Sequence, residues 1–219
     1  MKEVVNAGFL AIYQIGVVQS LLELAPEILK SASKVYGASA GSLIAAAVDL
    51  KQSFHEAAKD ARKTILGPLS PGCNMLRTVQ KGLYRMLPEN SHQVASGRLH
   101  ISLTRVIDGQ NVMVSEFTSK EDLIQVMRGG GGGGLPLCRA VITVSPFTGE
   151  LDICPRDCPA IFYSFRIFNT SIQISVENLC RISYALFPPS YLFYFQGYQD
   201  AVLFLHRNGK CYLEPENKK

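Results

Sequence analysis

The sequence predicts an α/β protein with three layers, in which helices cover both faces of a mostly parallel central sheet. Short apolar segments alternate along the chain with longer segments whose apolar residues recur at helical spacing, and this alternation is typical of α/β folds. A second observation is the pentapeptide Gly37-Ala38-Ser39-Ala40-Gly41, which stands between an apolar strand and a helix. With 219 residues, we expect a single domain that covers residues 1–219 and has a sizeable core.

The first predicted elements are a strand at residues 2–5 and a turn of small residues at 6–11 around Gly8. An amphipathic helix follows, because its apolar residues recur at a spacing that places them on one face; these residues are Ile15, Val18, Leu21 and Leu22. Pro26 then favours a helical turn at 27–31, since its fixed φ suits the first position of a helix. The strand before the serine turn is expected at 35–36 and the helix after it at 42–48.

Two further helices are predicted in the next part of the chain. Residues 52–64 form a charged helix, residues 67–72 a loop rich in Gly and Pro, and residues 74–87 an amphipathic helix. The last of these carries a basic stripe at i, i+4 and i+8, formed by Arg77, Lys81 and Arg85. This stripe has two interpretations, a solvated helix face and a contact with lipid headgroups.

A β-hairpin is predicted from two apolar runs at 99–107 and 112–117, with Asp108-Gly109 as its turn. Thr118 and Glu121 form a capping box for a helix at 119–127. The remaining predicted elements are a buried strand at 140–145, a short edge strand at 151–155, and helices at 172–186 and 194–207, the second stopped by Gly209.

The pentapeptide around Ser39 has the pattern of a nucleophile elbow, a sharp strand–turn–helix unit that exposes a serine hydroxyl. Gly37 and Gly41 lack side chains where backbone segments crowd together in such a turn. The N–H of Ala40 and the positive end of the following helix would lie beside a developing oxyanion. The alternative is a turn of small residues that only packs a helix against the sheet.

Composition excludes several classes of function. The net charge of +4 and pI near 8.7 are only mildly basic, and no motif typical of nucleic-acid binding is present. No apolar run is long enough to span a membrane, and the N-terminus lacks the apolar region of a signal peptide. Six irregularly spaced cysteines include one C-x-x-x-C pair, Cys154 and Cys158, but no second pair for a zinc site. We therefore expect reduced thiols, no metal, no cofactor and a cytoplasmic location.

Residues Gly129 to Gly134 form an uninterrupted run of glycines. Such a run behaves as flexible coil with a span of about 13 Å. It bridges two element ends but carries no side-chain chemistry, so we interpret it as a linker.

Motifs along nearly the whole chain resemble, in the same order, the patatin-like phospholipase domain family, in particular the branch of adipose triglyceride lipase and the epidermal acylceramide transacylase. They include Gly8-Phe9-Leu10, Leu24-Ala25-Pro26, the Ser39 pentapeptide, Ile101-Ser102-Leu103-Thr104-Arg105, Ser115-Glu116-Phe117-Thr118, Ile142-Thr143-Val144-Ser145-Pro146-Phe147, Asp152-Ile153-Cys154-Pro155 and Ala185-Leu186-Phe187-Pro188-Pro189. The resemblance implies a three-layer patatin-like sandwich with Ser39 as nucleophile of a serine–aspartate dyad. It also implies an oxyanion loop at Gly8 and Phe9.

The resemblance further implies hydrolysis or transfer of acyl groups from neutral glycerolipids such as triacylglycerol, or from phospholipids. The expected location is a lipid-droplet or membrane surface, with a coactivator of the α/β-hydrolase fold as a possible protein partner. None of the four histidines stands in a triad-like motif, which agrees with a dyad.

Two departures from the family pattern affect the expected activity. The oxyanion loop has a G-x-G-x-x-G pattern in the family, whereas Asn6 and Ala11 replace its first and last glycines here. The dyad aspartate belongs to an Asp-Gly-Gly motif that this chain lacks, and the glycine run stands in its place. Splicing, deliberate engineering and glycines that stand for unassigned residues all remain open as the origin of the run.

Without its base, a serine hydroxyl is a weak nucleophile, so we expect an acyl hydrolase or transacylase that is severely impaired or inactive. Asp152 and Asp157 are the candidates for a substitute base. The alternatives are a non-catalytic module that binds a lipid droplet or a partner, and a nucleotide-binding domain that uses the loop at Gly8. Phe9, Leu10 and Tyr13 either line an apolar substrate channel or pack the first helix. The aromatic tracts 162–168 and 191–195 either contact lipid or belong to the core.

Overall fold

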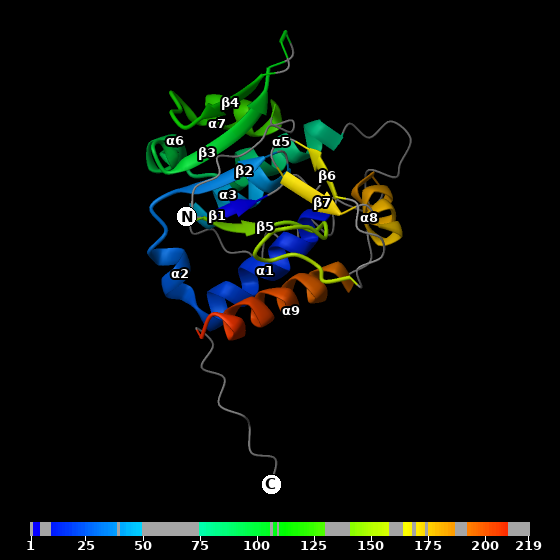
Figure 1. Ribbon diagram of the computed structural model, residues 1–219. Helices are drawn as coiled ribbons and strands as arrows, with labels where there is room; N and C mark the ends of the chain where they lie inside the picture. The colour runs from blue at the N-terminus through cyan, green and yellow to red at the C-terminus, as the bar shows by residue number, and fades with distance from the viewer. Residues whose placement is uncertain are drawn as a thin grey trace.

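A five-stranded sheet forms the centre of the described part of the chain, with strand order β4-β3-β2-β1-β5. The computed structural model describes residues 2–4, 10–38, 40–49, 75–105, 107–108, 110–129, 141–157, 164–167, 170–173, 175–186 and 192–209. The strands are β1 (Lys2–Val4), β2 (Val35–Ala38), β3 (Leu99–Thr104), β4 (Asn111–Val114) and β5 (Ile142–Val144) (Figure 1). All neighbours are parallel except β3 and β4, which form the predicted hairpin. The predicted mostly parallel sheet is confirmed.

The strand that precedes Ser39 lies in the middle of this sheet. All four residues of β2 are buried, so side chains on both of its faces are covered. Complete burial is typical of a parallel strand between two layers. The predicted α/β class is therefore confirmed.

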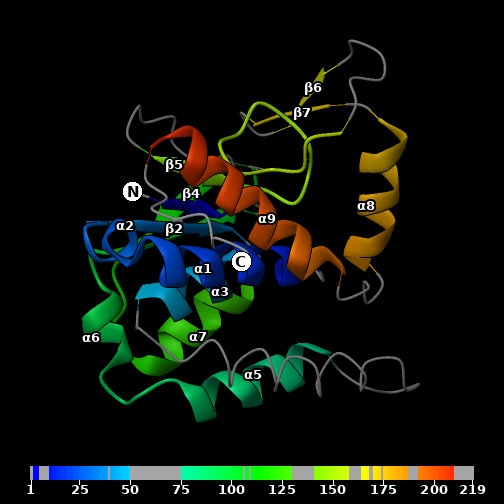
Figure 2. The same cartoon turned by 90° about the horizontal axis from the view of Figure 1, so that it is seen from below.

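Helices cover the sheet. They are α1 (Ala11–Leu24), α2 (Pro26–Lys30), α3 (Ala40–Asp49), α5 (Met75–Met86), α6 (Ser91–Ala95), α7 (Lys120–Gly129), α8 (Val176–Leu186) and α9 (Leu192–Arg207). Figure 2 shows α3, α5, α6 and α7 on one side of the sheet. The core on this side joins Ala45 of α3 and Leu123 of α7 to Ile101 of β3.

Helices α1 and α9 are far apart in sequence but pack closely together (Figure 1). Each contributes a glycine to the crossing. A Cβ atom at Gly16 would overlap the carbonyl of Tyr194, and one at Gly197 would overlap the carbonyl of Tyr13. The two backbones approach closely because both positions lack a side chain.

Several boundaries differ from the sequence prediction. The capping box is displaced by one residue: the backbone N–H of Asp122 donates to Ser119 Oγ at 3.0 Å, and the Asp122 carboxylate accepts from Thr118 N–H at 2.9 Å. The prediction of Thr118 and Glu121 as the box is wrong, because two overlapping Ser/Thr-x-x-acid patterns compete here. The edge strand predicted at 151–155 is only an isolated bridge between Ile153 and Val144.

The C-terminal third contains a hairpin that the sequence prediction missed. It consists of β6 (Ser164–Ile167) and β7 (Thr170–Gln173), which pair in antiparallel fashion. The helix predicted to begin at residue 172 begins at Val176. Leu22, predicted on the buried face of the first helix, is 40% exposed. The predicted helix at 52–64 and loop at 67–72 lie outside the described residues.

Candidate active site at the carboxyl edge of the sheet

The turn expected to carry the nucleophile is built from the end of β2 and the start of α3. The strand ends at Ala38 and the helix begins at Ala40, so a single residue, Ser39, connects them. Ser39 itself lies outside the described residues. A Cβ atom at Gly37 would lie 2.6 Å from the carbonyl oxygen of Gly41, so the crowding expected at this glycine is present. The geometry on both sides of Ser39 is that of an elbow.

The chain segments that follow β1 and β5 leave the sheet at the same edge as this turn. Val4 of β1 lies beside Gly37 of β2 on one side and beside Val144 of β5 on the other. The segment that contains Gly8 and Phe9 follows β1, and the segment from Ser145 follows β5. Ligands of open parallel sheets bind outside the carboxyl ends of the strands. This edge is therefore where a ligand is expected to bind.

The end of α7 lies close to the first turn of α3. Ser42 Oγ is 3.5 Å from the carbonyl oxygen of Met127, and the Ser42 side chain is buried. Two residues after Met127 the chain enters the glycine run. The glycine run therefore begins close to the first turn of α3.

The residues predicted around the oxyanion loop fall into two groups. Gly8 and Phe9 lie outside the described residues. Leu10 is fully buried in a cluster with Phe147 and Phe193. Tyr13 is also fully buried, and its hydroxyl donates to Asp200 Oδ2 at 2.7 Å. These contacts agree with the interpretation of Leu10 and Tyr13 as packing residues.

Tyr13 and Asp200 form a buried polar pair between α1 and α9. Burial, with a further contribution from the neighbouring Asp200 carboxylate, raises the pKa of the Tyr13 hydroxyl well above its ordinary value. Burial also raises the pKa of Asp200, although the hydrogen bond from Tyr13 opposes this shift. The pair ties α9 to α1, the helix that follows the segment of Gly8 and Phe9.

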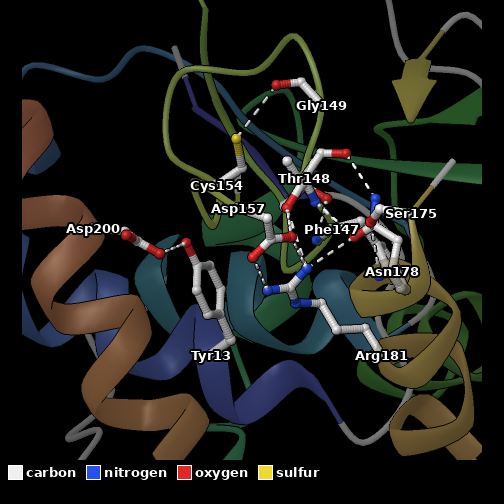
Figure 3. A network of polar contacts seen from close by, with 11 residues as sticks. Tyr13, Phe147, Thr148, Gly149, Cys154, Asp157, Ser175, Asn178, Arg181 and Asp200 are labelled. Carbon is white, nitrogen blue, oxygen red and sulfur yellow. Dashed lines mark hydrogen bonds and ion pairs between the residues drawn. The ribbon is translucent and has the colours of Figure 1, made fainter. Parts of the chain in front are cut away.

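The two carboxylates considered as substitute bases are both engaged elsewhere. Asp152 Oδ2 accepts hydrogen bonds from the backbone N–H and the hydroxyl of Thr143, at 2.7 and 2.8 Å. Asp157 forms a two-pronged ion pair with Arg181, with contacts of 2.5 and 2.8 Å (Figure 3). The hydrogen bond from Arg181 lowers the pKa of the Asp157 carboxyl. A carboxylate held in this way is a poor general base.

The Asp157–Arg181 pair belongs to a network that the sequence analysis missed (Figure 3). Thr148 Oγ1 donates to Asp157, and the Thr148 backbone exchanges hydrogen bonds of 2.9 Å with the Asn178 amide. Arg181 Nη1 also donates to Asn178 Oδ1 at 3.0 Å. The network fastens α8 to the segment that follows β5. No motif could have revealed it, because its members are separated by up to 33 residues.

Other classes of site are not visible in the described ranges. Within these residues no group of three His, Cys, Asp or Glu side chains is placed to hold a metal ion. None of the helices there is both long and apolar enough to cross a membrane. Of the six cysteines, Cys154 and Cys180 are described, and both are free thiols.

Comparison with known proteins identifies the family. Residues 7–131 match the model of the patatin-like phospholipase family, and the chain belongs to this family. It is 43% identical to the human protein named omega-hydroxyceramide transacylase, with 98% of this chain and 47% of the relative covered. It is 43% identical to human patatin-like phospholipase domain-containing protein 2, with 93% and 48% covered. It is 35% identical to mouse 1-acylglycerol-3-phosphate O-acyltransferase Pnpla3, with 94% and 59% covered. No solved structure matches the chain.

The extent of these matches has two consequences. The chain spans about half the length of the relatives it matches, at 47% and 48% for the two human proteins. The match to the transacylase extends over 250 residues, although this chain has only 219. The relative therefore contains residues that have no counterpart here.

Proposed function

We propose that the protein has the scaffold of a serine acyl hydrolase or transacylase for neutral glycerolipids or phospholipids, with Ser39 as the nucleophile. The observation that carries this proposal is the close approach of Gly37 to the first turn of α3, because a nucleophile elbow needs a glycine there. The names of the relatives, a transacylase, a phospholipase-domain protein and an acyltransferase, support acyl chemistry on lipids.

In this proposal the Ser39 hydroxyl attacks the ester carbonyl of the lipid, and the alcohol leaves with the serine proton. The resulting acyl-serine is then cleaved by water in hydrolysis or by an acceptor alcohol in acyl transfer. Backbone N–H groups of Ala40, Gly8 and Phe9 would stabilise the oxyanion. Each such donor is worth about 10²–10³ in rate.

We further propose that the activity of this chain is impaired, since no Asp-Gly-Gly motif occurs in its 219 residues. Asp152 and Asp157 do not offer a replacement, because each already has strong hydrogen-bond donors as partners. The oxyanion hole and binding alone leave about 10³–10⁴ of rate enhancement over water in other serine enzymes. Any remaining turnover should fall within this range.

The same missing base favours a second candidate, a non-catalytic module that binds a lipid droplet or a coactivator of the α/β-hydrolase fold. The two candidates are separated by inserting a family-like Asp-Gly-Gly segment in place of residues 129–134. The enzyme scaffold predicts that this variant hydrolyses a short-chain soluble ester, and that Ser39→Ala abolishes the reaction. If the repaired variant folds but shows no turnover that depends on Ser39, the proposal of an enzyme scaffold fails.

A further inference from the structure

Helix α8 is inverted relative to an ordinary surface helix. Such a helix buries its apolar side chains and exposes its polar ones. Among the α8 residues whose burial is described, 176–184, the buried side chains are polar: Asn178 is 3% exposed and Arg181 6%. The exposed side chains are mainly apolar, and we call four of them the α8 outer face: Val176, Leu179, Ile182 and Tyr184, which are 70, 59, 50 and 45% exposed.

The inward side of α8 explains how such a helix is held in place. Arg181 and Asn178 join the network with Asp157 and Thr148, in which charged and amide groups replace apolar packing (Figure 3). The Ser175 hydroxyl accepts a further hydrogen bond from the Asn178 backbone N–H, at 3.1 Å. The helix therefore stays attached to the body through polar groups, while its apolar side chains point outward.

The α8 outer face lies on the side of the molecule where the sheet has its carboxyl edge. Thr148, which bonds to α8, stands four residues after the end of β5. In Figures 1 and 2, α8 lies at the periphery, on the side opposite the C-terminal ends of α1 and α9. Tyr184 contacts Phe193 at the start of α9, with 5.4 Å between ring centroids. Two further exposed side chains, Leu192 and Phe195, continue the apolar surface there.

We infer that the α8 outer face rests on a lipid surface, with the helix parallel to the boundary between headgroups and acyl chains. This inference rests on the proposed function, because a lipid-facing α8 would bring the candidate active-site edge to the surface that holds the substrate. Charge supports lipid as the occupant: the α8 outer face has no ionisable group other than the Tyr184 phenol, and the exposed neighbours on the helix add one charge, Glu177. A neutral aliphatic face is complementary to hydrocarbon.

The charge of this face also predicts the kind of binding. Because the α8 outer face carries no Lys or Arg, adsorption should occur on uncharged phosphatidylcholine vesicles and should not weaken with salt. Binding through the basic side chains of α5, such as Lys81 and Arg85, would instead require anionic lipid and would weaken with salt. The two modes are therefore separable in one titration.

The first test uses the absence of tryptophan from the chain. Leu179→Trp places a single reporter on the α8 outer face of the full chain, and Leu203→Trp places a control on α9 at a site of similar exposure, 50%. With phosphatidylcholine vesicles, the emission of Leu179→Trp should shift to the blue and be quenched by brominated acyl chains. The control should show neither effect. No shift for Leu179→Trp, or equal shifts for both variants, overturns the inference.

The second test measures vesicle flotation. Leu179→Ser combined with Ile182→Ser should bind about tenfold more weakly. The matched control combines Leu22→Ser and Leu203→Ser, which replace two leucines that are 40 and 50% exposed near the other ends of α1 and α9. This control should bind like the unchanged chain, and circular dichroism should show all variants folded. Equal loss in both pairs contradicts the inference.

Other occupants of this surface give different results. If the unchanged chain self-associates and does not float with vesicles, and the Leu179 and Ile182 pair makes it monomeric, the occupant is a second copy. That outcome overturns a lipid surface. Vesicle binding needs no catalysis, so its failure leaves the activity of the repaired variant untouched. Conversely, failure of Ser39-dependent turnover with intact vesicle binding overturns the proposed enzyme and not the lipid-facing helix.

Discussion

At the scale of single residues, the ion pair between Asp157 and Arg181 should be costly to break. The two side chains are only 13 and 8% exposed, so removal of one charge leaves the other buried. Asp157→Asn should lower the free energy of unfolding by about 3 kcal/mol or more. Asp108→Asn, which breaks an ion pair at the surface, serves as the control and should change little. Denaturant unfolding of the two variants tests this difference, and equal effects would contradict it.

Asp157 also predicts how stability responds to acid. Its folded pKa is lowered by Arg181, so the folded state binds fewer protons than the unfolded state. The contribution is complete above the ordinary Asp pKa of about 3.9 and is lost as the pH falls through the lowered folded value. Asp157→Asn should therefore remove part of the acid dependence of the melting temperature. An unchanged pH profile would exclude this role.

Asp49 should make stability depend on pH in the opposite direction. Its side chain is fully buried beside Arg98, with 2.9 Å between Arg98 Nε and Oδ1, and burial raises its pKa. The folded state thus binds the proton more tightly, and stability declines as the pH rises from the ordinary Asp value through the raised one. At neutral pH the ionised carboxylate is costly to bury, so Asp49→Asn should raise the melting temperature. A lower melting temperature would show that the ion pair with Arg98 outweighs burial.

At the scale of elements, the crossing of α1 and α9 fixes the position of α1 against the rest of the domain. Gly197→Ala forces a methyl group against the Tyr13 carbonyl and should destabilise the protein by about 1–3 kcal/mol. Gly82→Ala is the matched control, because a Cβ there meets open space within a helix and should stabilise the protein by about 0.5–1 kcal/mol. Thermal unfolding of both variants measures the contrast. Similar shifts in both would contradict close packing at this crossing.

The elements also show how far the sequence determines structure. Hydrophobic periodicity predicted the strands of the sheet, and Gly37 marked the elbow, because both signals are local. The hairpin β6–β7 was missed because residues 162–168 were interpreted as an aromatic tract and residue 172 as the start of a helix, although Ser164–Ile167 alternates between polar and apolar residues. The capping box was displaced because Ser119 and Thr118 compete for the same helix end. The network of Thr148, Asn178 and Arg181 depends on tertiary packing, which no local pattern encodes. The roles of Ser39, Gly8 and Phe9 remain predictions.

For the whole molecule, family membership and the glycine run together support the proposal of an enzyme scaffold without its base. Inserting an Asp-Gly-Gly segment should restore activity partly, since Asn6 and Ala11 replace two family glycines in the oxyanion loop. Adding Asn6→Gly and Ala11→Gly should raise the rate further, by up to about 10²–10³ for each donor regained. The comparison needs four variants, with and without each change. If the glycine pair adds nothing to the repaired chain, the oxyanion loop is already competent.

The central claim is the proposal that the turn between β2 and α3 presents Ser39 as a nucleophile that lacks its base. The most direct measurement is covalent labelling by a serine-directed phosphonate, followed by mass spectrometry of the modified peptide. We predict a single adduct on Ser39, formed much faster after insertion of the Asp-Gly-Gly segment and absent in Ser39→Ala. An adduct on another residue, or equal labelling rates with and without the inserted segment, would contradict the account.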